Sequence, residues 1–126
     1  MCVLTLIFAK NKTMTFSDLN LNRFLLNALD DLGIKTPTPI QEKAFSVIMS
    51  SKDVIGIAQT GTGKTYAYLL PILRQITYSD QKFPRVLIVV PTRELVVQVV
   101  QEIKNLTPYI NIRYAGIYGG TNINND

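Results

Sequence analysis

Apolar residues early in the chain follow a helical spacing. Between residues 21 and 32 they lie three or four positions apart, at Leu21, Leu25, Ala28, Leu29 and Leu32. This spacing puts them on one face and predicts a helix over residues 21–32. Gly33 follows at the position where a left-handed residue commonly ends a helix.

A polar pattern predicts the start of a second helix. Thr38 fits the N-cap, Pro39 the first helical turn, and Gln41 the third position, from which a side chain can return to the cap. We expect this helix to end at about Ser50.

Two further helices are expected in the second half of the chain. One begins at Lys64 and runs to about Tyr78, and Pro71 should kink it or mark the end of its first two turns. The other follows Thr92, which can cap it, and reaches about Leu106.

Apolar runs between the helices predict β-strands at Val54–Ile57, Arg85–Val90 and Ile112–Tyr118. The second run is nearly continuous, which is typical of a strand covered on both faces. Strands alternate with helices, and this order predicts an α/β fold with an open parallel sheet flanked by helices and right-handed crossovers. We find no internal repeat and no linker long enough to divide the chain into domains.

The expected topology brings three peptides to one edge of the sheet. Parallel strands place their carboxyl ends on the same edge, where open α/β sheets bind ligands. Residues 58–65, 91–95 and 119–120 each follow a predicted strand directly. We therefore expect these three peptides to form the ligand site together.

The first of these peptides has the residues of a phosphate-binding loop, Ala58-Gln59-Thr60-Gly61-Thr62-Gly63-Lys64-Thr65. Its glycines allow backbone angles that turn N–H groups toward a phosphate, and the next helix adds free N–H groups. Lys64 can reach the β- and γ-phosphates, and the Thr65 hydroxyl can ligate Mg²⁺. The alternative is a glycine-rich turn with an incidental lysine, which the flanking strand and helix disfavour.

Two residues on the N-terminal side have two interpretations each. Gln41 either caps its helix or offers its amide to the edge of an adenine, and spacing alone favours capping. Phe16 is either a core residue or a platform on which a base stacks, and core aromatics are the more common.

The other two peptides at the sheet edge are also open to two interpretations. Residues Pro91, Thr92 and Arg93 begin a helix and can hold a second phosphate; otherwise Thr92 caps the helix and Arg93 pairs with Glu94 in solvent. Gly119-Gly120 either lets a nucleic-acid backbone approach closely or forms a plain turn.

Composition excludes several classes of protein. The 126 residues are 47% apolar, which disfavours disorder, and no apolar run is long enough to cross a membrane. Histidine is absent and Cys2 is the single cysteine, so Ser-His-Asp or Cys-His catalysis and an internal disulfide are excluded. A net charge of +4 mildly favours an anionic partner.

The N-terminus carries an eight-residue apolar run, residues 2–9. No basic residue precedes this run, so we do not expect an export signal and expect a cytoplasmic protein. Residues 1–13 are treated as an uncertain extension, and residues 14–126 as the domain.

Together these residues resemble the first part of a DEAD-box ATP-dependent RNA helicase. Residues 33–41 resemble the Q motif of that family, with Ile34 where phenylalanine is usual. Phe16 lies 17 residues earlier, where the family has an isolated aromatic residue. Residues 58–65 are similar to motif I letter for letter, including Ala58, where phosphate loops in general have glycine.

The resemblance continues to the end of the chain. Residues 91–98 resemble motif Ia, with Val96 where alanine is common, and Gly119-Gly120 matches the position of the GG doublet of the family. It spans residues 14–126 and implies the N-terminal portion of a RecA-like P-loop NTPase domain, which is incomplete here.

The resemblance also implies ligands for the candidate residues. ATP would lie on residues 58–65 with Mg²⁺ at Thr65, while Gln41 would bind adenine and Phe16 would stack on or near it. Pro91, Thr92, Arg93 and Gly119-Gly120 would line a track for single-stranded or short duplex RNA, through its phosphates and independently of base sequence.

One family motif is absent from the sequence. No Asp-Glu-Ala-Asp occurs, and the one adjacent acidic pair, Asp30-Asp31, precedes the phosphate loop. We therefore expect this chain to bind ATP weakly and neither to hydrolyse it nor to unwind RNA. The alternatives are another P-loop enzyme, such as a kinase or GTPase, and a non-catalytic RNA- or nucleotide-binding fragment.

Overall fold

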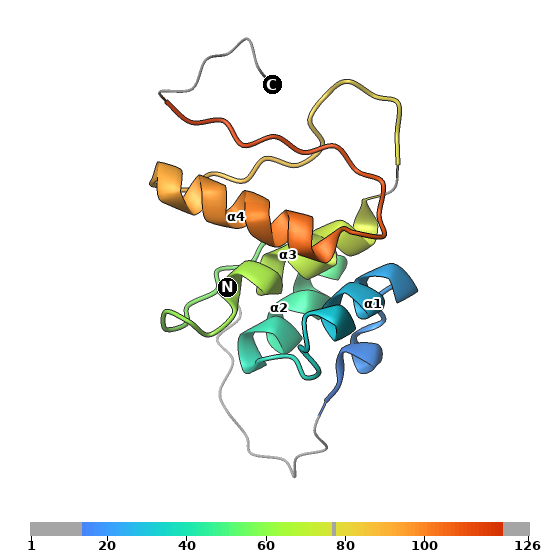
Figure 1. The fold of residues 1–126 in the computed structure, drawn as a ribbon. Coiled ribbons are helices and arrows are strands. Elements are labelled where there is room, and N and C mark those ends of the chain that lie inside the picture. The colour runs from blue at the N-terminus through green and yellow to red at the C-terminus, as the bar shows by residue number, and fades with distance from the viewer. Residues whose placement is uncertain (1–13, 77, 120–126) are drawn as a thin grey trace.

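The fold is built on α-helices. The computed structural model describes residues 14–76 and 78–119. Within them a short 3₁₀ helix, η1 (Phe16–Leu19), precedes four α-helices: α1 (Arg23–Asp31), α2 (Pro39–Met49), α3 (Lys64–Gln75) and α4 (Arg93–Leu106). Figure 1 shows the helices gathered into one group, with extended chain beside α4.

Capping residues set the ends of the first helix. The Asn22 side chain accepts a hydrogen bond from the Leu25 amide at 2.9 Å, so α1 begins at Arg23, two residues later than the apolar spacing alone predicts. Gly33 ends the helix at a φ of +70°, and the Ile34 amide donates to the Leu29 carbonyl at 2.9 Å. The predicted left-handed stop is confirmed.

The other three helices begin where the sequence predicts. Helices α2 and α4 also end within a residue of expectation, whereas α3 ends at Gln75, before Tyr78. Pro71 lies buried inside α3, and the helix continues past it for another turn.

Apolar side chains from every helix, most of them leucines, form the core. Leu25 of α1 and Leu106 of α4 are fully buried, and Leu69 and Leu70 of α3 are 1% exposed. Core residues from all five elements make one cluster: Phe16, Leu19, Leu21, Leu25, Leu29, Phe45, Leu69, Leu70, Leu73 and Leu106. The helices therefore hold one another in place through apolar contact.

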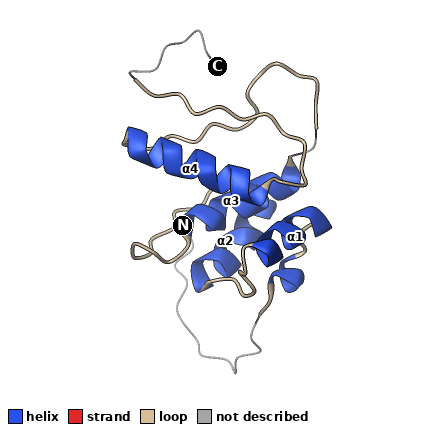
Figure 2. Ribbon diagram, viewed as in Figure 1, coloured by secondary structure: helices blue, strands red, loops and turns tan. Residues whose placement is uncertain are grey.

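The predicted parallel sheet is not formed. Figure 2 shows no strand among the described residues, and segments 54–57, 85–90 and 112–118 run as extended chain. Within residues 14–76 and 78–119, no backbone hydrogen bond joins one of these segments to another. A strand is complete only when a neighbour supplies its hydrogen-bond partners, so extended sequence by itself does not make a sheet.

The extended segments nevertheless keep the alternation of strands. Ile55 and Ile57 are each 90% exposed, and Leu87 and Val89 are 84% and 82% exposed. Ile88, between the last two, packs against the helical core. One face of segments 85–90 and 112–118 is thus covered by helices and the other is bare, whereas all four residues of segment 54–57 are exposed.

Segment 112–118 lies along α4, as Figure 1 also shows in orange and red. A Cβ added at Gly116 would lie 2.8 Å from Val100 and 3.1 Å from Val96, so glycine allows the close approach. The Arg113 guanidinium donates to the carbonyls of Ser79 and Gln81 at 3.0 and 2.7 Å. These contacts fasten the segment to α4 on one side and to residues 79–81 on the other.

Across the described part of the chain, none of the helices has the length and apolar character required to cross a bilayer.

Candidate functional site

The candidate phosphate loop joins extended segment 54–57 to α3. Gly61 and Gly63 adopt left-handed φ angles of +80° and +81°, a conformation that costs any other residue steric strain. Gly63 is the N-cap of α3 and Lys64 its first residue. The loop therefore has the turn between extended chain and helix start that phosphate binding needs.

The Lys64 side chain folds back over the start of the loop. Its Nζ donates to the carbonyls of Ala58 and Gln59 at 2.5 and 3.0 Å, and the Thr62 hydroxyl also donates to the Gln59 carbonyl, at 2.7 Å. The first helical bond of α3 runs from the Ala67 amide to the Gly63 carbonyl, so the preceding amides have no acceptor within the helix. The loop thus holds an ammonium group and free helix-start donors side by side.

Gln41 connects α2 to this loop. Its Oε1 accepts from the Thr38 amide at 2.9 Å, which confirms the predicted capping role, and its Nε2 donates to the Gly63 carbonyl at 3.1 Å. The side chain is 4% exposed. The capping residue of one helix therefore also fixes the N-cap of another.

Gly63 has no room for a side chain. A Cβ at this position would lie 2.4 Å from Gln41 Nε2 and 3.4 Å from Thr38 Oγ1. That hydroxyl is buried without a hydrogen-bond partner among the described residues. The Thr38 hydroxyl is therefore free to make a hydrogen bond beside the loop, and its burial costs the hydrogen bonds that it would make with water.

Phe16 lies in the helical core, apart from the loop. Its ring is 3% exposed, in keeping with the core interpretation. With Ile34, Lys35 and other residues it lines a separate hollow of about 320 Å³, which neither Gln41 nor residues 58–65 reach. Its role in stacking stays a prediction.

The second and third peptides of the expected edge do meet. Arg93 donates from Nη2 to the Gly119 carbonyl at 2.6 Å, and the Thr92 hydroxyl caps α4 by accepting from the Leu95 amide at 3.3 Å. Pro91 is exposed, directly before them. Gly120 lies outside the described residues. A cationic side chain and a helix start are thus placed together, which suits an anion.

Two tyrosines after the loop were not among the predicted site residues. The Tyr66 hydroxyl donates to Glu102 of α4 at 2.7 Å, and burial together with this carboxylate raises its pKa well above the usual value. Burial also raises the pKa of Tyr68, against a lowering by its hydrogen bond with Thr65. Tyr66 and Glu102 lie 36 residues apart, so their pairing leaves no local signal in the sequence.

Among the described residues, no three acidic, histidine or cysteine side chains gather as metal ligands. A divalent cation at this site would have to rely on the Thr65 hydroxyl and on oxygens of a bound nucleotide.

Comparison with known proteins identifies the family. The sequence model of the DEAD/DEAH box helicase family matches residues 38–126, which include Gln41, the phosphate loop and the start of α4. The chain belongs to the DEAD/DEAH box helicase family.

Relatives of known name agree with this assignment. The ATP-dependent RNA helicase DeaD of Haemophilus influenzae is 44% identical over 108 residues, which are 85% of this chain and 18% of that protein. The chain thus spans less than a fifth of the length of this curated relative.

Solved structures of the family share the backbone arrangement. A DEAD box protein from the hyperthermophile Methanococcus jannaschii superposes with a TM-score of 0.80 at 35% identity, covering 87% of this chain and 30% of that one. The RNA helicase Prp28 from Chaetomium thermophilum, bound to ADP, superposes with a TM-score of 0.68 at 38% identity. The superposition covers 78% of this chain and 25% of that one. The helical elements therefore have the positions found in this family.

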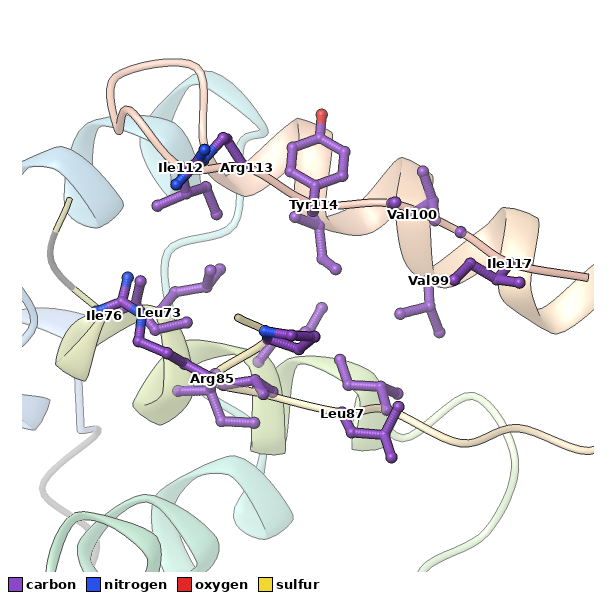
Figure 3. A pocket seen from close by; sticks show the side chains of 18 of the residues that line it. Leu73, Ile76, Arg85, Leu87, Val99, Val100, Ile112, Arg113, Tyr114 and Ile117 are labelled. Carbon is purple, nitrogen blue, oxygen red and sulfur yellow. The ribbon is translucent and has the colours of Figure 1, made fainter. Parts of the chain in front are cut away.

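This DEAD/DEAH box chain also has an apolar groove of about 600 Å³ between α3, α4 and the extended segments. Figure 3 shows Leu73 of α3 and Val99 of α4 on facing sides of it, with Leu87 and Ile117 from the extended segments. The groove runs along the extended segments and contains no residue of the phosphate loop.

Proposed function

We propose that this chain is the ATP-binding portion of an ATP-dependent RNA helicase. The observation that carries the proposal is the phosphate loop, with its two left-handed glycines, Lys64 at the start of α3, and Gln41 bound to the Gly63 carbonyl. A phosphate loop alone fits any P-loop enzyme. Its attachment to residues 33–41 favours the helicase over a kinase or GTPase.

The residues present fit a nucleoside triphosphate with Mg²⁺. The free amides at the start of α3 and the Lys64 ammonium would hold phosphate oxygens, and the Thr65 hydroxyl would face the metal ion. Lys64 would exchange the carbonyls of Ala58 and Gln59 for those oxygens. Bound ATP would supply the phosphoryl group whose transfer to water drives the helicase cycle.

Gln41 keeps hydrogen-bonding groups for adenine beyond its present contacts, and at 4% exposed it must, like Phe16, become accessible to the base. A primary amide has two N–H donors and two acceptor lone pairs. The Thr38 amide uses one lone pair, and the Gly63 carbonyl uses one N–H donor. One donor and one acceptor thus remain for an adenine edge. Stacking on Phe16 is part of the same proposal and requires η1 to shift, because the ring is 3% exposed.

RNA is the proposed partner of the second site. Pro91, Thr92, Arg93 and Gly119, with Gly120 beyond the described residues, would follow the phosphates of a single strand or short duplex. Both ligands are abundant inside the cell, and we propose a cytoplasmic location. We also propose that the extended segments join a parallel RecA-like sheet when a partner covers their bare face, and that residues 14–126 form one domain.

The proposal is tested by nucleotide titration of the whole chain. We expect Mg·ATP to bind, and Lys64→Ala to weaken binding at least tenfold, about 1.4 kcal/mol. Gln41→Ala should weaken ATP more than GTP, because only adenine presents the matching edge. Lys104→Ala, which removes the same charge from the last turn of α4, is the matched control. Equal affinity for ATP and GTP in all variants would favour a different P-loop enzyme.

RNA binding is tested separately with a labelled oligonucleotide of mixed sequence. Arg93→Ala should reduce affinity for all sequences alike and flatten the salt dependence, because phosphate contacts carry no base information. Phosphate release in the presence of RNA should stay at background. Turnover abolished by Lys64→Ala would contradict the expectation that this chain is inactive alone.

A further inference from the structure

Tyr66 links the phosphate loop to a distant helix. It directly follows Thr65 as the third residue of α3, and its hydroxyl donates to Glu102 Oε2 at 2.7 Å across the space between α3 and α4. Both side chains are half-buried. Partial burial strengthens a hydrogen bond to a carboxylate and limits competition from water.

Helix α4 extends this link to the second candidate site. Glu102 lies in the same continuous helix as Arg93, whose guanidinium donates to the Gly119 carbonyl at 2.6 Å. Gly116 lies close against Val96 and Val100 of the same helix. A displacement of α4 at Glu102 therefore carries Arg93 and segment 112–119 with it.

A ligand on the phosphate loop must displace the Lys64 side chain at the start of α3. Lys64 now occupies the carbonyls of Ala58 and Gln59, and it must release them to reach a phosphate. Lys64 and Tyr66 belong to the same first helical turn. The geometry of this turn therefore determines where the Tyr66 hydroxyl meets α4.

We propose that the Tyr66–Glu102 hydrogen bond is a positioning contact that couples nucleotide binding at the phosphate loop to RNA binding at the start of α4. This inference rests on the proposed function and deepens it. Coupling is reciprocal by thermodynamic necessity, so nucleotide changes RNA affinity by the same factor as RNA changes nucleotide affinity.

The test measures that factor in variants of the whole chain. RNA affinity is determined with and without the Mg²⁺ complex of a non-hydrolysable ATP analogue. We expect nucleotide to change RNA affinity severalfold in the unaltered chain, and Tyr66→Phe to bring the factor to nearly one. Affinity for each ligand alone should stay within about twofold, because neither hydroxyl nor carboxylate belongs to either site.

Variants at Glu102 and Tyr109 make the test specific. Glu102→Leu should abolish coupling as Tyr66→Phe does, and the double variant should be no worse than either single one. Glu102→Gln should preserve it, since an amide oxygen still accepts the hydrogen bond. Tyr109→Phe is the matched control, because it removes a hydroxyl that donates to Asp31 at 2.5 Å, outside both sites.

The outcomes separate the inference from the function on which it rests. If the unaltered chain binds no nucleotide, the proposed function fails and the coupling with it. If the chain binds both ligands independently, the function stands and the inference is overturned. The same holds if nucleotide still changes RNA affinity by the original factor in Tyr66→Phe. If coupling between nucleotide and RNA binding falls as much in Tyr109→Phe as in Tyr66→Phe, the effect is a general structural one and the inference is also overturned.

Discussion

The helices and the extended segments of this chain both carry apolar side chains, yet they bury them very differently. Leu25 in α1 is fully buried, whereas Leu87 in an extended segment is 84% exposed. The backbone of a helix satisfies its own hydrogen bonds within a few residues, while a strand depends on a neighbour. In the described part of this chain the helices thus bury their apolar side chains, and the extended segments do not.

The largest difference should appear in amide hydrogen exchange. Amides of Leu69 and Leu70 are helical and buried, and those of Leu87 and Val89 lie in exposed extended chain. We expect exchange to differ by about three orders of magnitude, in line with the modest stability of a small domain. The measurement is exchange followed by NMR in dilute protein. Equal protection in both regions would mean that segments 85–90 and 112–118 pair as strands in solution.

A pair of leucine substitutions gives the next largest effect. Leu25→Ala should lower the free energy of unfolding by about 2–5 kcal/mol, because it opens a cavity in the core. Leu87→Ala should change it by less than about 0.5 kcal/mol, because the side chain is already in water. Urea denaturation of both variants measures the difference. Similar losses would place Leu87 inside a formed sheet.

Two glycines between extended segment 54–57 and α3 give a smaller difference in stability. Gly61 and Gly63 have nearly the same left-handed φ, so alanine at either should cost about 1–2 kcal/mol of unfolding free energy. Gly63→Ala should cost more than Gly61→Ala, since only its Cβ would collide with Gln41. Thermal unfolding of both variants, and of each combined with Gln41→Ala, checks this. The excess cost should shrink once Gln41 is removed.

The smallest effect concerns alkaline pH. The pKa of Tyr66 is raised in the folded chain, so its contribution to stability is complete below the usual tyrosine pKa of about 10 and declines as pH rises beyond that. Tyr66→Phe should therefore flatten the fall in stability above about pH 10. Denaturation across pH 9–11 measures it. A slope unchanged from the parent chain would mean that neither burial nor Glu102 raises the pKa of Tyr66.

The sequence predicts what is locally encoded. Thr38 and Gln41 of the α2 cap, the Gly33 stop and the Thr92 cap all act within a few residues, and the helix ends follow them. Residues 58–65 likewise predict their own left-handed turn. These features depend on backbone sterics and short-range hydrogen bonds, which a short window of sequence contains.

Contacts between distant residues are what the sequence leaves out. The second bond of Gln41, to Gly63, spans 22 residues, and Tyr66 meets Glu102 across 36. The strands fail for a related reason, because a short apolar run predicts extended chain but supplies no neighbour to pair with it. Arg93 and Gly119 do meet as expected, although no sheet holds them together.

The bare side of the extended segments has a practical consequence for handling the protein. This side exposes the side chains of Ile55, Ile57 and Ile117 beside backbone that can pair with another strand. Molecules that meet through this surface should therefore associate. Binding measured at high concentration would then report aggregates. Titrations at low micromolar concentration, with light scattering recorded alongside, keep each measurement on single molecules.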